Sequence, residues 1–236
     1  GTDAERPGSA FPSGAWERAG TIIETQTNGR GASGQCVPKR SLGTSDKRVV
    51  SSFSGTYAMK KRSMPLSKVY GLLEPGPVVL LTTAWKGQPN VMPMSWLTML
   101  EFSPPQFACV VSNRNHSFDA LRKTRQCVVN IPTAELAEQV VGCGNTSGRK
   151  VDKFKRFGLT PLPAATVEAP LIDECYANLE CRVIDTRMVN KYSLFVLEAT
   201  KAWIASGAKR PRTIHHEGRG MFIVAERRIK LPSVKL

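Results

Sequence analysis

The densest group of side chains that could do chemistry is a six-residue stretch that opens a predicted short helix. Its members are two serines, two asparagines, an arginine and a histidine: Ser112, Asn113, Arg114, Asn115, His116 and Ser117. Free N–H groups at a helix N-terminus attract anions, and an arginine adds a fork of donors that matches phosphate. A turn that is merely capped needs one Ser or Asn, so this density of donors predicts a phosphate-binding site.

A second candidate is the segment 90–99, in which small, polar and apolar residues surround Pro93. A proline inside a strand leaves main-chain N–H and C=O groups unpaired on one side. Such an edge can hydrogen-bond a flat heterocycle while Met94 and Trp96 pack nearby. An ordinary edge strand explains the same pattern equally well.

A third candidate is the basic loop 147–154, which begins with Ser147 and Gly148. Glycine and several cations could close over an anionic ligand, with Lys153 reaching in. A solvated charged surface is the usual explanation of such a run, and on its own it is sufficient.

The remaining histidines do not form a metal site. His215 and His216 are adjacent on a predicted strand, so their side chains point to opposite faces and cannot both bind one metal ion. The chain offers only His116 besides, so we expect no metal and a structural or ligand-neighbouring role for this pair. No catalytic triad has a meaningful spacing, which indicates that a cofactor supplies the difficult chemistry.

Composition sets the class of protein. The 236 residues include 33 Lys+Arg and 19 Asp+Glu, a net charge of +14, with 41% hydrophobic residues. These values are typical of a globular protein, and the positive charge fits either a solvated basic surface or a domain that handles anions, such as a flavin phosphate, a dinucleotide or nucleic acid. No run approaches the roughly 18 apolar residues of a membrane-spanning helix, so we expect a soluble protein with no membrane partner.

The six cysteines are too sparse for a disulfide scaffold and form no Cys-x-x-Cys. Most lie in apolar runs, which predicts buried, reduced thiols and a cytoplasmic location.

The chain divides near residue 58. Residues 1–58 are rich in Gly, Ser and Thr without helical or strand periodicity, and we interpret them as a disordered or non-native extension, with Met59 as a plausible start. A partner-binding arm is the alternative. Residues 59–236 form the predicted domain.

Within this domain, apolar runs predict many strands and few helices. The predicted strands are Val78–Trp85, Asn90–Leu100, Phe107–Ser112, Cys127–Ile131, Ala177–Thr186, Tyr192–Ile204, Met221–Val224 and Arg228–Leu231. The predicted helices are Ser117–Thr124 capped by Ser117, one that begins at Thr133, and Val151–Phe157 ended by Gly158. The absence of a βαβ rhythm favours a mainly antiparallel β-barrel with helical excursions, and no Rossmann or P-loop motif is present.

Together these segments resemble the flavin reductase-like family of FMN-binding split barrels, in particular its flavoredoxin branch. The matching motifs, in chain order, are Pro77–Thr83, Asn90–Trp96, Asn115–Phe118, Val129–Pro132, Ser147-Gly148 with Asp152–Phe154, Ala169–Ile172, Asn178–Cys181 and His215–Gly218. The resemblance implies an antiparallel Greek-key barrel and a homodimer that holds two FMN molecules near the subunit interface.

The resemblance also assigns site residues. The ring-binding strand falls on Met94, Ser95, Trp96 and Thr98, the phosphate-binding turn on Ser112, Asn113, Arg114, His116 and Ser117, and a further element near the flavin on Lys153 and Phe154. Catalytic residues are not assigned. At Asn190–Tyr192 the chain departs from the Gly-Asp-His-like turn of many related reductases, which weakens the case for a His-assisted nicotinamide site.

The resemblance implies an FMN oxidoreductase that takes electrons from NAD(P)H or another donor and passes them to a small-molecule or protein partner. Two alternatives stay open: a non-enzymatic FMN electron carrier, and a basic nucleic-acid-binding module, which would be colourless. We expect no nucleic acid partner, because the interleaved aromatic residues of strand binders are missing.

Overall fold

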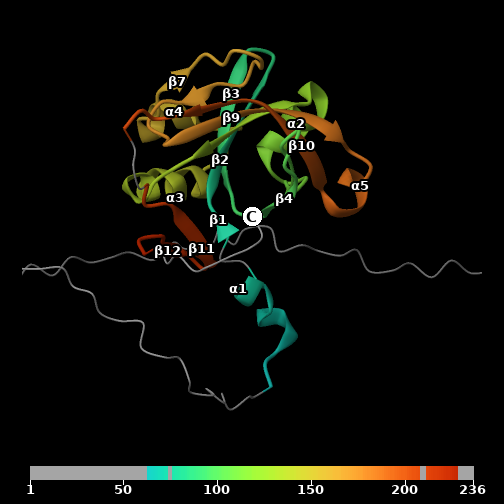
Figure 1. Cartoon of the computed structure of the whole chain (residues 1–236), viewed down its shortest axis with the longest axis vertical. Helices are drawn as coiled ribbons and strands as arrows, with labels where there is room; N and C mark the ends of the chain where they lie inside the picture. Colours follow the sequence, from blue (N-terminus) through green and yellow to red (C-terminus); the bar gives the residue numbers. More distant parts are fainter. Residues whose placement is uncertain (1–62, 74–75, 208–210, 228–236) are drawn as a thin grey trace, which may run out of the picture. The chain divides into compact units, whose positions relative to one another are not determined.

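The computed structural model describes residues 63–73, 76–207 and 211–227 (Figure 1). Three predictions lie outside these residues: the extension 1–58, the domain start at residue 59 and the strand Arg228–Leu231. The described elements, in chain order, are η1 Leu66–Lys68, α1 Tyr70–Leu73, β1 Gly76–Pro77, β2 Val79–Trp85, β3 Gln88–Met94, β4 Leu97–Glu101, β5 Gln106–Val110, α2 His116–Thr124, β6 Gln126–Ile131, η2 Ala134–Leu136, α3 Ala137–Asn145, α4 Lys153–Phe157, β7 Pro161–Leu162, β8 Leu171–Ile172, β9 Ala177–Asp185, α5 Val189–Tyr192, β10 Leu194–Ile204, β11 Ile214–Gly218 and β12 Met221–Val224.

The main sheet has seven antiparallel strands in the order β3-β2-β6-β9-β10-β5-β4. Its two edge strands, β3 and β4, are joined by only Ser95 and Trp96. Two residues span at most about 10 Å, so the sheet must roll until its edges meet at this link. A mainly β, barrel-like fold is therefore confirmed.

Strand β2 lies between two cores, which is why apolar residues occupy the consecutive positions 79–81 rather than alternate ones, and its two polar residues, Thr82 and Thr83, are buried as well. Val79 and Leu81 join a core that includes Phe195, whereas Leu80 joins a core that includes Val140. Full burial of each of these side chains contributes roughly 1.5–3 kcal/mol. Helix α2 packs on the first core and α3 and α4 on the second, so β2 runs between them (Figure 1).

Three details differ from the predicted elements. The single strand predicted over Asn90–Leu100 is interrupted at Ser95 and Trp96, where the chain passes from one sheet edge to the other. The predicted cap Ser117 lies inside α2, and Asn115 is the N-cap. A short helix, α5, replaces the start of the strand predicted from Tyr192. The predicted C-cap Gly158 is confirmed, with φ 63°.

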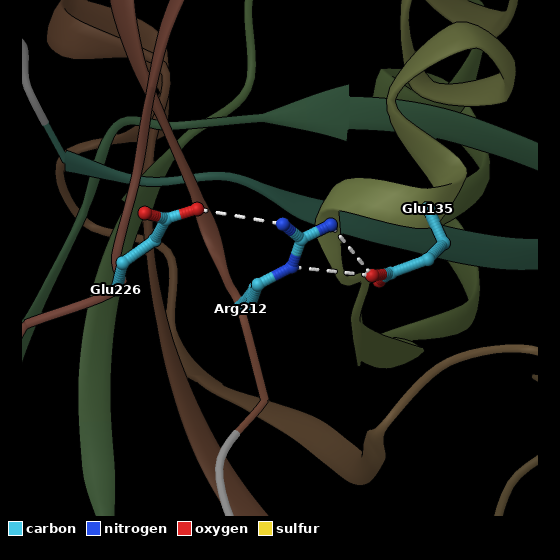
Figure 2. Close-up of polar contacts among 3 residues, drawn as sticks. All are labelled: Glu135, Arg212 and Glu226. Atoms are coloured by element: carbon cyan, nitrogen blue, oxygen red, sulfur yellow. Dashed lines mark hydrogen bonds and ion pairs between the residues drawn. The ribbon is translucent and has the colours of Figure 1, made fainter. Parts of the chain in front are cut away.

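A smaller sheet, β1-β11-β12, is fastened to the start of η2 by Arg212 (Figure 2). The Arg212 guanidinium lies 2.9 Å from Glu135 Oε1 and 3.4 Å from Glu226 Oε1. The main-chain oxygen of Arg212 accepts a 2.7 Å hydrogen bond from Ala134 N–H. The two histidines of β11 occupy opposite faces, as predicted. His216 is buried against Phe222, with ring centroids 5.3 Å apart.

Five cysteines lie in the described part of the chain, and all are buried free thiols, which confirms their prediction as small core residues: Cys109, Cys127, Cys143, Cys175 and Cys181. Burial raises the pKa of the Cys109 thiol to about 12. Residues 63–73, 76–207 and 211–227 contain no cluster of three or more His, Cys, Asp or Glu side chains that could hold a metal ion. None of the helices in these ranges is long and apolar enough to cross a membrane.

Candidate functional site

The donor-rich turn lies between β5 and α2. Asn115 has extended backbone at the N-cap position but makes no side-chain capping bond. The turn is folded by its own main chain, since Asn115 N–H donates to Ser112 O at 3.0 Å and Arg114 N–H donates to Ser112 Oγ at 3.3 Å. Asn113, Arg114 and His116 are exposed and Ser112 is half-buried. The nine-residue helix α2 therefore opens on a polar, accessible surface.

Ser117 is the buried member of this group, and β3 holds it. Asn90 Nδ2 donates a 2.8 Å hydrogen bond to Ser117 Oγ in a buried environment. Directly opposite Asn90 in the β2–β3 pair is Thr83, whose buried Oγ1 has no hydrogen-bond partner among the residues that the structure describes. The sequence-based assignment missed Asn90 and Thr83 as site residues. Their signal was a polar residue beside the apolar run of each of two consecutive strands.

The basic loop, which the sequence presented as a separate candidate, lies against the same turn. A Cβ added to Gly148 would overlap Asn90 Oδ1 and would lie 3.0 Å from His116 Cδ2. Glycine is therefore required at this position for a close approach. The loop also places Arg149 near His116: partial burial lowers the pKa of His116, and the charges of Arg149 and Lys153 lower it further, while Asp119 opposes them. Two predicted candidates thus form one cationic surface.

Lys153 lies at the start of α4 and is buried, with 6% of its surface exposed. Its Nζ donates to Val91 O at 2.9 Å and to Cys143 O at 2.7 Å, which differs from a side chain that reaches out toward a ligand. Burial lowers the pKa of Lys153 to about 8, and the Cys143 thiol acts in the opposite direction. Phe154 is 4% exposed and packs in the second core. Both residues lie behind the surface rather than on it.

The predicted ring-binding residues lie at the link between the sheet edges. Met94 is buried in the first core with Phe118, so this link and the start of α2 share one core. Ser95 is half-buried, whereas Trp96 and Thr98 are exposed. Trp96 O accepts a 3.0 Å hydrogen bond from Val110 N–H, which fixes the link to β5. A flat ligand could meet main chain and small side chains along this exposed segment.

The described residues thus combine a rolled antiparallel sheet, flanking helices and a helix N-terminus without a side-chain cap beside basic residues. The chain belongs to the family described as the flavin reductase like domain, whose model matches residues 72–222. The resemblance found in the sequence is therefore confirmed.

Known proteins agree on this fold. A protein of Archaeoglobus fulgidus is 35% identical over 111 residues, which are 47% of this chain and 63% of that relative's length. Flavoredoxin of Desulfovibrio vulgaris (Miyazaki F) superposes with a TM-score of 0.65 at 20% identity, covering 75% of this chain and 99% of that one. An FMN-binding domain of a flavin reductases-like enzyme from Shewanella baltica gives a TM-score of 0.62 at 23% identity, covering 72% and 96%.

Proposed function

We propose that this protein is an FMN-dependent oxidoreductase that receives electrons from NAD(P)H or another donor and delivers them to an acceptor. The observation that supports it most is the convergence of the α2 N-terminus with the Gly148 loop beside His116. Free N–H groups, hydroxyls and cations together suit the phosphate of FMN, which is a dianion near neutral pH. The family membership and the FMN-binding structures of the same fold support the same cofactor.

In this proposal the phosphate is held by the turn and the isoalloxazine ring lies along the link between the sheet edges. The phosphate residues are Ser112, Asn113, Arg114, His116 and Ser117, and the ring residues are Met94, Ser95, Trp96 and Thr98. When bound, FMN supplies the capacity to accept a hydride and release electrons. The protein anchors the phosphate and orients the ring, and its positive charge favours the anionic reduced flavin. Lys153 and Phe154 stay in the proposed site as its support.

We propose that the protein works as a homodimer. After Leu97, every residue of β4 is exposed, including Met99 at 56% and Leu100 at 53%, and Phe102 beyond it is 80% exposed. An apolar edge strand that is exposed on both faces is normally covered by another chain. Light scattering of the purified protein should give the mass of a dimer, and a monomer would contradict this proposal. The basic charge suits an acidic redox partner, and the free thiols suit the cytoplasm.

The cofactor assignment is tested by FMN titration of the apoprotein and of the Arg114→Ala/Ser117→Ala variant. Each hydrogen bond to a charged group contributes roughly 1.5–3 kcal/mol, so the variant should lose at least about tenfold in FMN affinity. Arg122→Ala removes an exposed charge from the last turn of the same helix and should leave the affinity unchanged. Equal affinity of the double variant and the parent would refute the phosphate assignment.

An electron carrier without reductase activity is the second candidate. It is supported by α5, which occupies the position where related reductases have a Gly-Asp-His-like turn and which contains no histidine. Stopped-flow mixing of the FMN-loaded protein with NADH or NADPH separates the two functions, because rapid bleaching of the flavin indicates a reductase and slow bleaching a carrier. A colourless preparation that binds nucleic acid would oppose both.

A further inference from the structure

Lys153 is a buried cation whose two hydrogen-bond acceptors within the described part of the chain belong to different elements. Its ammonium bonds Val91 O on β3 and Cys143 O on α3, at 2.9 and 2.7 Å. Main-chain carbonyls carry partial rather than full negative charge, so they compensate a buried ammonium incompletely. A lysine at this position therefore costs free energy unless another group gains from its charge.

The two carbonyls belong to the segments that build the candidate phosphate site. Val91 follows Asn90, whose amide holds Ser117. Cys143 lies in α3, which leads after Asn145 into the loop of Gly148. The contact of Gly148 with Asn90 requires these two segments to stay in register, and Lys153 is the side chain that bridges them.

The charge of Lys153 also reaches the site. It lowers the pKa of His116 together with partial burial and Arg149, while Asp119 raises it. An anion bound at the α2 N-terminus would therefore interact with Lys153 as well as with Arg114, His116 and Arg149, and of these four basic groups Lys153 is the one behind the surface. Such an anion supplies the negative charge that the two carbonyls lack.

We propose that Lys153 is a positioning residue for the phosphate: its ammonium locks β3 to α3, which leads into the Gly148 loop, without touching the ligand, and the bound anion balances its buried charge. This inference rests on the proposed FMN function, because it gives Lys153 a role in holding that cofactor's phosphate. It replaces the sequence-based expectation of a lysine that reaches into the site.

The test compares FMN with riboflavin, which lacks only the phosphate, by quenching of flavin fluorescence on the full chain. Lys153→Met should reduce the ratio of FMN to riboflavin affinity at least about tenfold and change riboflavin affinity less than about twofold. The matched control is Lys155→Met on the same helix, which removes a lysine whose side chain is 88% exposed and should leave the ratio unchanged. An unchanged ratio for a folded Lys153→Met protein overturns the inference.

Action through β3, rather than direct contact, is tested in an Asn90→Ala background. If Lys153 works by holding Asn90, Lys153→Met should change the ratio of FMN to riboflavin affinity less than about threefold in the Asn90→Ala chain. If Lys153→Met lowers this ratio as much in Asn90→Ala as in the parent, the positioning role is overturned. If the parent itself binds FMN no better than riboflavin, the proposed phosphate site fails, and that outcome is distinct from failure of the Lys153 variant.

A measurement on the unaltered protein decides the matter if Lys153→Met does not fold. Calorimetric titrations at pH 8 in buffers of different ionisation enthalpy count the protons taken up on binding. FMN phosphate is already a dianion at this pH, so proton uptake with FMN but not with riboflavin supports a lysine that gains charge beside the phosphate. Absence of uptake with FMN overturns the inference.

Discussion

Gly148→Ala tests the geometry on which the proposed site depends. Gly148 does not require a left-handed backbone, so the substitution introduces a contact and little else. The new Cβ would overlap Asn90 Oδ1 and would lie 2.7 Å from Asn90 Cγ and 3.0 Å from His116 Cδ2. Asn90 is 8% exposed and cannot turn away without breaking its 2.8 Å bond to Ser117 Oγ. Relief must therefore come from that bond or from the loop.

The magnitude follows from the group that is left unpaired. A buried amide or hydroxyl without a partner costs roughly 1–3 kcal/mol, so Gly148→Ala should lower the free energy of unfolding by about that amount. A displaced loop also moves Arg149 away from the phosphate, and each 1.4 kcal/mol of lost interaction weakens FMN binding about tenfold. Urea unfolding of the apoprotein and FMN titration measure the two effects.

A double-mutant cycle supplies the control. In an Asn90→Ala chain the overlapping oxygen is absent, so Gly148→Ala should cost less than about 1 kcal/mol in unfolding free energy. The coupling between the two substitutions isolates the contact between β3 and the loop. If Gly148→Ala costs the same in both backgrounds, the close approach is not what requires glycine, and the reasoning is wrong.

Three other substitutions probe charge. Partial burial and neighbouring cations hold the pKa of His116 below 6.5. As the pH falls below that value His116 gains a positive charge, so the ratio of the parent's FMN affinity to that of His116→Asn should rise. Burial raises the pKa of Glu180, but hydrogen bonds from Ala165, Thr166 and Trp203 outweigh it and bring the pKa to about 2. The ionised Glu180 carboxylate therefore stabilises the fold above pH 4.5, and this stabilisation is lost as pH falls toward 2. Glu180→Gln should remove that pH dependence from acid-unfolding curves. The same substitution should lower the free energy of unfolding by roughly 2–3 kcal/mol at pH 7. Arg212→Ala breaks half-exposed ion pairs and should lower the urea midpoint only slightly, with a smaller difference in high salt.

Local chemistry in the sequence predicted several features well. The apolar run that opens β2 identifies a buried strand, because a segment covered on both faces carries apolar residues at consecutive rather than alternate positions. Gly158 ends α4 in the left-handed conformation that glycine adopts without a steric penalty. The donors before Phe118 also predict an anion site from residue types alone, since helix N-termini and basic side chains act over a few residues, and this stays a prediction that FMN titration tests.

The tertiary structure decided where these parts meet. Ser117 is not the cap of α2, because the helix begins at His116 with Asn115 as its N-cap, and the Ser117 hydroxyl instead accepts a hydrogen bond from Asn90, 27 positions earlier in the chain. The break at Ser95 and Trp96 exists because the rolled sheet brings its two edges together. The sequence presented the turn before α2 and the Gly148 loop as separate candidates, and folding made them neighbours.

Lys153 shows the physical reason for this division. Its position in a basic run predicted a charged group at the site, but its acceptors are main-chain oxygens of Val91 and Cys143. Every residue has such an oxygen, so no pattern of side chains distinguishes these two. The sequence determines which groups can donate and which segments are buried, whereas only the packing of β3 against α3 and α4 determines which carbonyl a buried ammonium meets.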